Sequence, residues 1–529
     1  MTLKNPAPSV QLNLPDLSLS ALDRFAAGLL PLLRAGDFIA LSGELGSGKT
    51  AFARALISRL LGPQSHEEIP SPSFAILQTY ETARMPVYHF DFFRLVGVEE
   101  AVELGLDEAL NNGLVLAEWP DRLENELPQD RLEIHFREAT DLDLRHLRIV
   151  GTGTFAARLQ RFIDIDRFLF EAGWNKAWRQ FAQGDASSRT YTKLSKTDDT
   201  ALLMDAPRQP DGPPIRDNRP YSSFAHLAED VRPFVAIAAA LQNEGYSTPE
   251  ILASDLDKGL LLLEDFGNTQ FGYLLNRPRE EGGALAMAPL YEAATRLLAD
   301  MSSKTPAMNL PLPEGPDYKL PFYNLEAYGI ELELLLDWFW PATKNAEAPA
   351  ALRAQYLELW QTALTPVLEQ SNNWVLRDVH SPNLMWLEER QGNRQVGLID
   401  FQDAQRGHAA YDLVSLLQDA RVDVPVELEK HCLELYSSLV KTQNPAFDEQ
   451  AFLASYATLG AQRNTKILGI FIRLAKRDHK PSYLAHIPRV AGYLTRNLRH
   501  PALAELENWY DRHVPVEERA SPMRDATSP

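Results

Sequence analysis

Cysteine and long apolar stretches are largely missing from this sequence. Cys432 is the single cysteine among 529 residues, which excludes an internal disulfide and a zinc site built on cysteine ligands. No apolar run approaches the roughly 20 residues that a membrane-spanning helix needs. The segment from Met1 to Leu19 has no apolar signal-peptide core. These absences predict a soluble, cytoplasmic protein.

Positive charge is also scarce. Lys and Arg total 52 against 72 Asp and Glu, for a formal net charge of −20. Residues 1–150 carry a net charge of −9 and the remainder carries −11, so both parts are acidic. A protein that binds nucleic acid by itself needs a concentrated basic patch. We therefore expect no direct strong nucleic-acid binding, and any RNA would have to be held by another subunit.

The rest of the composition predicts a globular protein with several domains. Its hydrophobic fraction is 45%, and a chain of this length has room for about three or four domains of about 150 residues. Residues 1–152 alternate helical and strand patterns, which predicts an α/β domain with a mainly parallel sheet and some antiparallel pairing. Helices are expected at 19–33 and 50–61, and strands at 37–41, 87–90, 114–118, 132–136 and 144–150.

The second part of the chain is predicted to form two lobes. After a small polar junction at 151–154, residues 155–268 are rich in short strands, whereas residues 269–515 are mainly helical. The polar residues 516–529 are expected to be a disordered tail. The smaller lobe is predicted to contain a helix at 155–173, strands at 189–196 and 201–205, a Pro-rich loop at 207–220 and a strand at 259–264.

A phosphate-binding loop lies between a predicted strand and a predicted helix. The segment from Gly43 to Thr50 reads Gly-Glu-Leu-Gly-Ser-Gly-Lys-Thr, which is a complete P-loop. Its glycines, Gly43, Gly46 and Gly48, let backbone N–H groups point at phosphates. Lys49 can reach the β- and γ-phosphates, and Thr50 can offer its hydroxyl to Mg²⁺. ATP and Mg²⁺ are therefore the expected cofactors.

Four further motifs follow the P-loop. They are Ser71–Phe74, Tyr88–Leu95, Glu103–Glu108 and Leu116–Arg122. Over about residues 15–150, these motifs and the P-loop resemble the TsaE family of ATPases, which are needed for threonylcarbamoylation of the adenosine beside the tRNA anticodon, with Ser73 where Thr is usual and Phe92-Phe93 where Leu-Tyr is common. The resemblance implies that the ATPase drives turnover of a complex with two partners, the TsaB and TsaD proteins.

The resemblance also suggests roles for single residues. Asp91, at the end of a predicted strand, is the candidate carboxylate for Mg²⁺, and Ser73 could respond to the γ-phosphate. Glu118 is the candidate to position or activate the attacking water. Trp119 could flank the nucleotide. Structural or packing roles are the alternatives for Asp91, Glu118 and Trp119, and His89 is expected to be a packed histidine.

A second ATP site, of unrelated design, begins more than three hundred residues later. In the segment Leu376–Asn383, Asp378 is the candidate base that accepts the proton of an acceptor hydroxyl. Asn383, five residues later, is a candidate metal ligand. After a predicted strand-turn-strand, Asp400 matches the metal-binding Asp of the kinase D-F-G motif. This spacing predicts phosphoryl transfer from ATP to a hydroxyl group.

The nucleotide contacts of this second site are less clear in the sequence. Ser187 lies in a loop that is expected to cover the phosphates of ATP. The backbone near Glu264 is expected to form hydrogen bonds with the adenine base. Met204 stands where many kinases have a lysine that holds the α- and β-phosphates. Arg189 is the candidate replacement cation, with a plain surface role as the alternative.

Several segments of the second part carry a family resemblance. They are Gly184–Ser187, Leu203–Pro207, Arg232–Phe234, Leu262–Gly267, Ile399–Ala404, Ala410–Leu413, Gln418–Arg421, Arg463–Gly469 and Trp509–His513. Over about residues 155–515, these segments look like the aminoglycoside-phosphotransferase superfamily. Within it, they are most similar to AmgK-type kinases, which phosphorylate the anomeric hydroxyl of N-acetylmuramate and N-acetylglucosamine. The resemblance implies an amino-sugar kinase of peptidoglycan recycling, fused to the ATPase.

The sugar pocket and the reason for the fusion stay open at this point. Aromatic residues at 328 and 338–340 could stack on a sugar ring, although helix packing is the favoured interpretation. Arg463 and Lys466 could meet the carboxylate of N-acetylmuramate. Two other functions remain: an antibiotic kinase of the aminoglycoside type fused to the ATPase, or one nucleotide site that acts only as a regulatory sensor. The expected fold is an α/β P-loop NTPase domain followed by a two-lobed, protein-kinase-like α+β domain.

Overall fold

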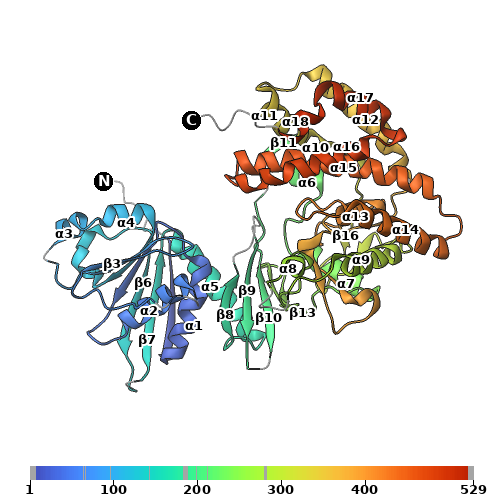
Figure 1. Cartoon of the computed structure of the whole chain (residues 1–529). Coiled ribbons are helices and arrows are strands. Elements are labelled where there is room, and N and C mark those ends of the chain that lie inside the picture. Colours follow the sequence, from blue (N-terminus) through green and yellow to red (C-terminus); the bar gives the residue numbers. More distant parts are fainter. Residues whose placement is uncertain are drawn as a thin grey trace. The chain divides into compact units, whose positions relative to one another are not determined.

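The computed structural model of the chain divides into two compact units, and each is described by itself (Figure 1). The first unit consists of Met1–Pro207 and Leu252–Asp265, and the second of Arg208–Ile251 and Phe266–Pro529. Within the described residues, no helix is both long and apolar enough to cross a membrane. The structure describes residues 8–62, 65, 67–95, 97–141, 143–182, 189–197, 199–210, 212–278 and 283–521.

A seven-stranded mixed sheet forms the beginning of the first unit, in the order β1-β7-β6-β2-β5-β4-β3. The central strands β6, β2, β5 and β4 run parallel, while β1, β7 and β3 add antiparallel pairs at the two edges. The sheet thus combines parallel and antiparallel pairing, as predicted. Its strands are β1 (Ser9–Leu17), β2 (Phe38–Ser42), β3 (Leu77–Tyr80), β4 (Val87–Asp91), β5 (Leu114–Glu118), β6 (Arg131–Glu138) and β7 (Arg145–Thr152).

Helices cover both faces of this sheet, which explains why β2 and β5 are almost entirely apolar. Side chains of α1, α2 and α5 form one core with one face of the sheet, and side chains of α3 and α4 form another with the opposite face. The helices are α1 (Leu19–Leu29), which continues as the 3₁₀ turn η1 (Leu30–Leu32), α2 (Lys49–Leu61), α3 (Val98–Glu103), α4 (Leu106–Asn112), η2 (Pro120–Glu126) and α5 (Thr154–Glu171).

Helix α5 contributes to two cores. Phe155, Leu159 and Phe162 pack in the core of the seven-stranded sheet. Further along the same helix, Phe168 and Leu169 pack in the core of the next sheet. The helix predicted at 155–173 is therefore present, but its first half completes the preceding domain. A domain that ended at residue 152, as predicted, would lack these three core side chains of α5.

The second sheet of the first unit has five antiparallel strands in the order β13-β14-β10-β9-β8. Three of them lie where strands were predicted, whereas β8 and β13 were missed by the sequence analysis. β8 is an edge strand, and Trp178 on it lies beside the guanidinium groups of Arg24 and Arg59. The strands are β8 (Trp178–Ala182), β9 (Thr190–Ser195), β10 (Thr200–Asp205), β13 (Ile251–Asp255) and β14 (Leu260–Glu264).

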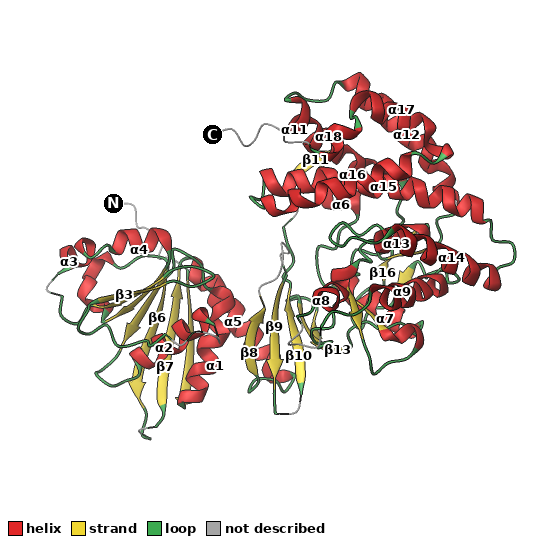
Figure 2. Cartoon of the chain, in the orientation of Figure 1, coloured by secondary structure: helices red, strands yellow, loops and turns green. Residues whose placement is uncertain are grey.

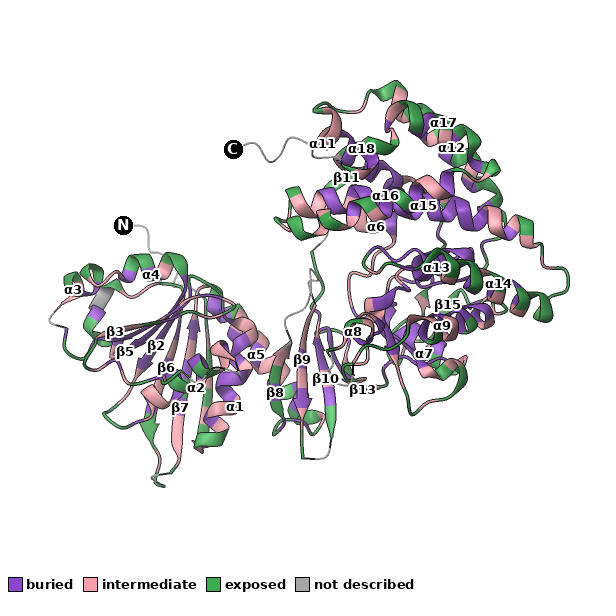
Figure 3. Cartoon of the chain, in the orientation of Figure 1, coloured by how far each residue is buried: buried purple, intermediate pink, exposed green. Residues whose placement is uncertain are grey.

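The second unit is mainly helical (Figure 2). Its longest helix, α15, is buried through its middle turns (Figure 3). The helices are α6 (Tyr221–Ala225), α7 (Arg232–Asn243), α8 (Phe271–Asn276), α9 (Met287–Met301), α10 (Leu325–Leu334), α11 (Trp340–Lys344), α12 (Ala350–Glu369), α13 (Ala410–Leu417), α14 (Val426–Gln443), α15 (Glu449–Lys476), α16 (Ile487–Leu498), α17 (Ala504–His513) and α18 (Val516–Ala520), with shorter turns at η4 (Leu335–Phe339), η5 (Ser381–Asn383), η6 (Gly392–Gln395), η7 (Pro481–His486) and η8 (Pro501–Leu503).

Short strand pairs accompany these helices. β17 pairs with β20, and β18 pairs with β19, so that the chain between β17 and β20 is held at both ends. This is the segment that carries the three predicted residues of the second ATP site. The strands are β11 (Pro214–Arg216), β12 (Arg219–Pro220), β15 (Asn309–Leu310), β16 (Tyr318–Lys319), β17 (Asn373–Val375), β18 (Leu384–Trp386), β19 (Val396–Leu398) and β20 (Gln405–Gly407).

Two predictions are corrected by these elements. The Pro-rich stretch 207–220 is not wholly a loop, because β11 and β12 pair within it. The disordered tail was predicted to begin at residue 516, but α18 extends to Ala520. Arg519 is buried there and bonds to Val514 and Asp511. A buried arginine with these partners fixes the segment, which a count of polar residues could not reveal. Residues 522–529 of the predicted tail lie outside the described residues.

Candidate active sites

The P-loop connects β2 to α2 through a backbone that needs glycine. Gly43, with φ of 147°, leaves no room for a side chain, because a Cβ there would lie 2.7 Å from the carbonyl oxygen of Phe136. Gly48 caps α2 in the left-handed region with φ of 109°, where other residues are strained. The loop thus presents the N-terminus of α2, where N–H groups without helical partners favour phosphate.

Lys49 lies folded back on this loop. Its Nζ donates to the carbonyl oxygens of Gly43 at 2.7 Å and Glu44 at 2.9 Å. The ammonium also lies 4.2 Å from the centre of the Trp119 ring. Burial lowers the pKa of Lys49, and the charges of Glu118, Asp91 and Glu44 oppose this shift. Lys49 and Trp119, which were predicted separately as nucleotide contacts, therefore lie against each other.

Glu118 contacts Thr50, at the position where a metal carboxylate would be expected. Thr50 Oγ1 donates to Glu118 Oε1 at 2.8 Å, and the same carboxylate oxygen lies 3.1 Å from His89 Nε2. All three strands involved are parallel neighbours, so their carboxyl ends meet at one edge of the sheet. His89 is completely buried. It was expected to be packed, and it also orients Glu118, a contact that the sequence does not indicate.

Asp91 makes different contacts. Its carboxylate accepts a hydrogen bond from Ser73 Oγ at 2.7 Å and one from the Phe93 backbone N–H at 3.0 Å. Trp119 has a left-handed backbone, with φ of 59°, and its ring packs 5.0 Å from that of Phe93. Strained backbone of this kind often marks functional sites. The metal role of Asp91 stays a prediction, and the geometry favours Glu118 as the carboxylate nearest Thr50.

Two carboxylates, Asp412 in α13 and Asp419 just after it, hold the segment that carries the second site. The backbone N–H groups of Leu376 and Arg377 donate to the Asp412 carboxylate at 2.6 and 2.9 Å. Arg377 has a left-handed backbone with φ of 72°. Ser381 donates from its backbone N–H at 2.9 Å, and from its hydroxyl at 2.6 Å, to Asp419. These buried carboxylates hold the loop around Asp378 in one conformation.

The three predicted residues of this site lie together. Asn383 Nδ2 donates to the Asp378 carbonyl oxygen at 3.1 Å and to Asp400 Oδ2 at 3.4 Å. Asp400 has a left-handed backbone with φ of 59°, and its Oδ1 accepts a hydrogen bond from Gln402 at 2.9 Å. The Asp378 side chain remains 43% exposed. An acceptor hydroxyl can therefore approach it, while the Asp400 carboxylate and the Asn383 amide are close enough to share a metal ion.

A buried charge network lies behind Asp378. Glu331 is fully buried and accepts from Arg377, from Tyr323 and, at 3.0 Å, from Lys466. Lys466 also donates to the Tyr411 hydroxyl at 3.1 Å. Burial alone would raise the pKa of Glu331, but the charges of Lys466 and Arg377 outweigh it and lower the pKa. Sequence analysis missed Glu331 because nothing near residue 331 repeats a kinase motif.

The network keeps Asp378 ionised. Burial acts to raise the pKa of Asp378, but the charges of His380, Lys466 and Arg463 outweigh it and lower the pKa to about 2. Burial also lowers the pKa of His380 to about 4. At neutral pH, Asp378 is therefore a carboxylate, which is the form that a base for an acceptor hydroxyl requires.

The remaining candidates are placed as follows. Ser187 lies outside the described residues. Arg189 and Glu264 belong to the first unit, Arg189 immediately before β9 and Glu264 at the end of β14. Of the aromatic candidates for sugar stacking, Tyr328, Phe339 and Trp340 are buried, which agrees with the favoured packing interpretation.

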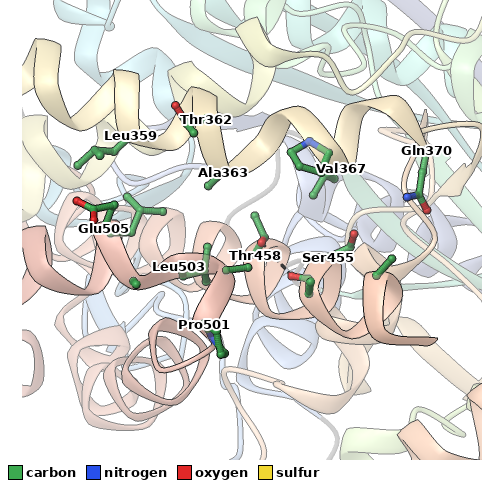
Figure 4. A pocket seen from close by; sticks show the side chains of 16 residues that line it. Leu359, Thr362, Ala363, Val367, Gln370, Ser455, Thr458, Pro501, Leu503 and Glu505 are labelled. Atoms are coloured by element: carbon green, nitrogen blue, oxygen red, sulfur yellow. Dashed lines mark hydrogen bonds between the residues drawn. The ribbon is translucent and has the colours of Figure 1, made fainter. Parts of the chain in front are cut away.

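A separate pocket of about 310 Å³ lies between α12, α15 and the η8–α17 segment (Figure 4). Pro366, Thr458 and Leu503 are among the residues that line it. None of the residues predicted for either ATP site is among them. This pocket is therefore no part of the chemistry described above.

His408 gives a pH-dependent prediction for this unit. Its Nδ1 accepts a hydrogen bond from the Ala410 N–H at 3.1 Å, and burial lowers its pKa to about 4. Between about pH 6.5 and pH 4 the unfolded chain binds more protons at this residue, so the free energy of unfolding falls as the pH falls. In His408→Asn this fall should be smaller by about 2 kcal/mol between pH 7 and pH 5.

Urea unfolding at the two pH values measures the difference. His431→Asn is the matched control, since His431 is 55% exposed and pairs with Glu292 at the surface. The control should keep the pH dependence of the unmodified chain. Equal pH dependence in His408→Asn and the unmodified chain would contradict the assignment of a neutral buried imidazole.

Comparison with known proteins identifies both parts. The family model for threonylcarbamoyl adenosine biosynthesis protein TsaE matches residues 17–147, and that of the phosphotransferase enzyme family matches residues 177–447. An N-acetylmuramate/N-acetylglucosamine kinase of Caulobacter vibrioides is 38% identical over 362 residues, covering 66% of this chain and 96% of the relative. A TsaE protein of Rickettsia felis is 38% identical over 127 residues, covering 24% of this chain and 72% of the relative. The chain belongs to both families.

The TsaE region and the phosphotransferase region follow each other as predicted. The predicted fold class is confirmed, and so is the interpretation of the chain as a bifunctional, ATP-using enzyme. An ADP-bound aminoglycoside phosphotransferase matches 66% of this chain and 98% of its own length, at 12% identity and a TM-score of 0.38, which is too low to add to the argument. The roles of single site residues stay predictions, and so does the border between the two predicted lobes of the phosphotransferase region.

Proposed function

We propose that the phosphotransferase region transfers the γ-phosphoryl group of ATP to the anomeric hydroxyl of N-acetylmuramate and N-acetylglucosamine. The observation that carries this proposal is the convergence of Asp378, Asn383 and Asp400, with Asp378 ionised and open to an acceptor. The similarity to the kinase of Caulobacter vibrioides over almost its whole length supports these sugars as substrates. In this proposal, Asp378 is the base that accepts the proton of the hydroxyl.

The donors present fit Mg²⁺ bound together with ATP. Magnesium usually takes one or two protein carboxylates and completes its shell with phosphate oxygens and water. Asp400 offers a carboxylate, and Asn383, whose Nδ2 faces Asp400 in this structure, would offer its amide oxygen after the side-chain amide turns over, which suits this pattern. Among the described residues, no group of three or more His, Cys, Asp or Glu side chains could hold a metal ion. When bound, the ion would neutralise charge on the phosphates.

Phosphorylation by the purified full-length chain tests this proposal. Release of ADP would be measured with ATP and each of N-acetylmuramate, N-acetylglucosamine and a set of aminoglycosides. We expect turnover of the two N-acetylated sugars. Turnover of aminoglycosides alone would instead support the antibiotic-kinase alternative, and no turnover of either class would support a regulatory sensor.

For the TsaE region, we propose ATP hydrolysis that supports formation of threonylcarbamoyladenosine in tRNA, together with the TsaB and TsaD proteins. The contact between Thr50 and Glu118 supports a Mg²⁺ site at these two side chains, because hydroxyl and carboxylate oxygens are suitable ligands. Lys49 would turn from the loop carbonyls to the phosphates when ATP binds. Ser73, which donates to Asp91, would respond to the γ-phosphate.

Removing the Lys49 side chain tests the ATPase. Lys49→Ala should lower the rate of ATP hydrolysis by about 10²-fold or more, because a positioned cation on the transferred phosphate is lost. Hydrolysis is expected to be weak alone and to increase with TsaB and TsaD, so the rate is measured with both proteins present and with Asp378→Asn in the background. Arg148→Ala, a change at an exposed position of β7, is the control. Normal hydrolysis in Lys49→Ala would refute the assignment.

A further inference from the structure

Arg463 is a buried cation with unused hydrogen-bond donors beside Asp378. It lies in the middle of α15 and is 5% exposed. Its Nη2 is 3.6 Å from Asp378 Oδ1. Its Nε and Nη1 atoms are buried and have no hydrogen-bond partner among the described residues. A buried guanidinium with open donors is costly, so these donors are expected to be satisfied by a bound substrate.

The neighbouring cations are already paired. Lys466 donates to Glu331 and Tyr411, and Arg377 donates to Glu331 and to the Ala225 carbonyl oxygen. These hydrogen bonds hold the Lys466 and Arg377 side chains in place within the protein. Of the three cations around Asp378, Arg463 therefore has donors left for an acceptor molecule, whereas Lys466 is engaged in the protein. This separates the two residues that sequence analysis had grouped.

The position of Arg463 limits which atom of the sugar it can reach. If Asp378 holds the anomeric hydroxyl, a donor close to Asp378 meets groups on the carbons next to the anomeric centre. The 2-acetamido carbonyl oxygen is such a group, and it is a stronger acceptor than the ring oxygen. The carboxylate of N-acetylmuramate is attached through the oxygen on the third carbon, farther from the reacting hydroxyl.

We propose that Arg463 donates to the carbonyl oxygen of the 2-acetamido group and so selects N-acetylated sugars. This inference rests on the proposed sugar-kinase function. It also explains how one site can accept both sugars, because they share this group and differ at the third carbon. A polycationic aminoglycoside would be repelled by the same guanidinium.

Kinetics of Arg463→Gln in the full-length chain test the proposal. Acceptors are N-acetylglucosamine, N-acetylmuramate, glucosamine and glucose. Loss of a charged hydrogen bond should lower kcat/KM for both N-acetylated sugars by a similar factor, about 10–100-fold. The value for glucose should change less than about threefold, and the value for glucosamine should stay the same or rise, because its 2-ammonium group is no longer repelled by the guanidinium. Where their turnover is too slow to measure, their inhibition constants against N-acetylglucosamine provide the comparison.

Arg477→Gln is the matched control, because Arg477 ends the same helix and pairs with Asp478 at the surface. An equal loss on all four acceptors would overturn the proposal and indicate a role in phosphoryl transfer or in folding. A loss confined to N-acetylmuramate would also overturn it, in favour of contact with the carboxylate. If the unmodified chain phosphorylates neither N-acetylated sugar, the proposed function itself fails, which is a different result from either of these.

Discussion

Replacing Asp378 with asparagine should lower kcat of sugar phosphorylation by about 10³-fold or more. Asparagine keeps the size of the side chain but cannot accept the proton of the acceptor hydroxyl, and positioned proton transfer contributes about 10²–10⁴-fold. The substitution also removes the charge that balances Arg463 and Lys466. The affinity for ATP should change little, because Asn383 and Asp400 remain. The measurement is ADP release with saturating N-acetylglucosamine, in the full-length chain.

Two comparisons make this result specific. Asp423→Asn removes an exposed carboxylate that pairs with Arg489, and it should leave kcat unchanged. ATP hydrolysis by the TsaE region should also be unchanged in Asp378→Asn, and an unchanged affinity for ATP at the second site would show that the phosphotransferase region is folded. If Asp378→Asn retained more than about a tenth of kcat, Asp378 would not be the base.

Ending the TsaE region before α5 should prevent it from folding stably. The fragment 1–152 follows the border predicted from sequence, but it lacks Phe155, Leu159 and Phe162, all of which are buried in its core. Truncating a buried Phe to Ala costs about 3–5 kcal/mol and truncating a buried Leu about 2–5 kcal/mol. The total is comparable with the whole stability of a domain, about 5–15 kcal/mol.

The fragment 1–166 is the matched comparison, because it keeps these three side chains and omits Phe168 and Leu169, the buried side chains of α5 in the core of the next sheet. Urea unfolding should show a cooperative transition for 1–166, and a much lower midpoint or no transition for 1–152. Equal midpoints would show that α5 is dispensable for this core. A kinase fragment that begins at residue 155 would, by the same argument, expose the three apolar side chains.

Much of both sites could be predicted because their residues lie close in sequence. The P-loop is eight consecutive residues, and the glycines reveal its backbone. Asp378 and Asn383 are five residues apart, and one strand-turn-strand returns the chain to Asp400. In each case, the local backbone geometry brings the site residues close to one another. The edge strand β8 was missed because Trp178–Ala182 is a short segment in which alternation is hard to distinguish from loop.

Contacts between distant residues could not be predicted in this way. Glu331, Arg377 and Lys466 come from α10, the loop after β17 and α15, and nothing in their spacing indicates that they meet. The same holds for Glu118 and Thr50, which were assigned to water and to metal separately. Such contacts depend on how helices and strands pack, and packing is decided by the whole core.

The sequence by itself determined the two ATP-binding designs, their order, the families and the reaction class. These follow from short motifs whose chemistry is local. Only the tertiary structure decided that α5 completes the core of the first domain, that Glu118 lies against Thr50, and that Arg463 keeps open donors while Lys466 is paired. The physical reason is that burial and charge pairing arise between residues far apart in the chain, and they exist only once the cores have formed.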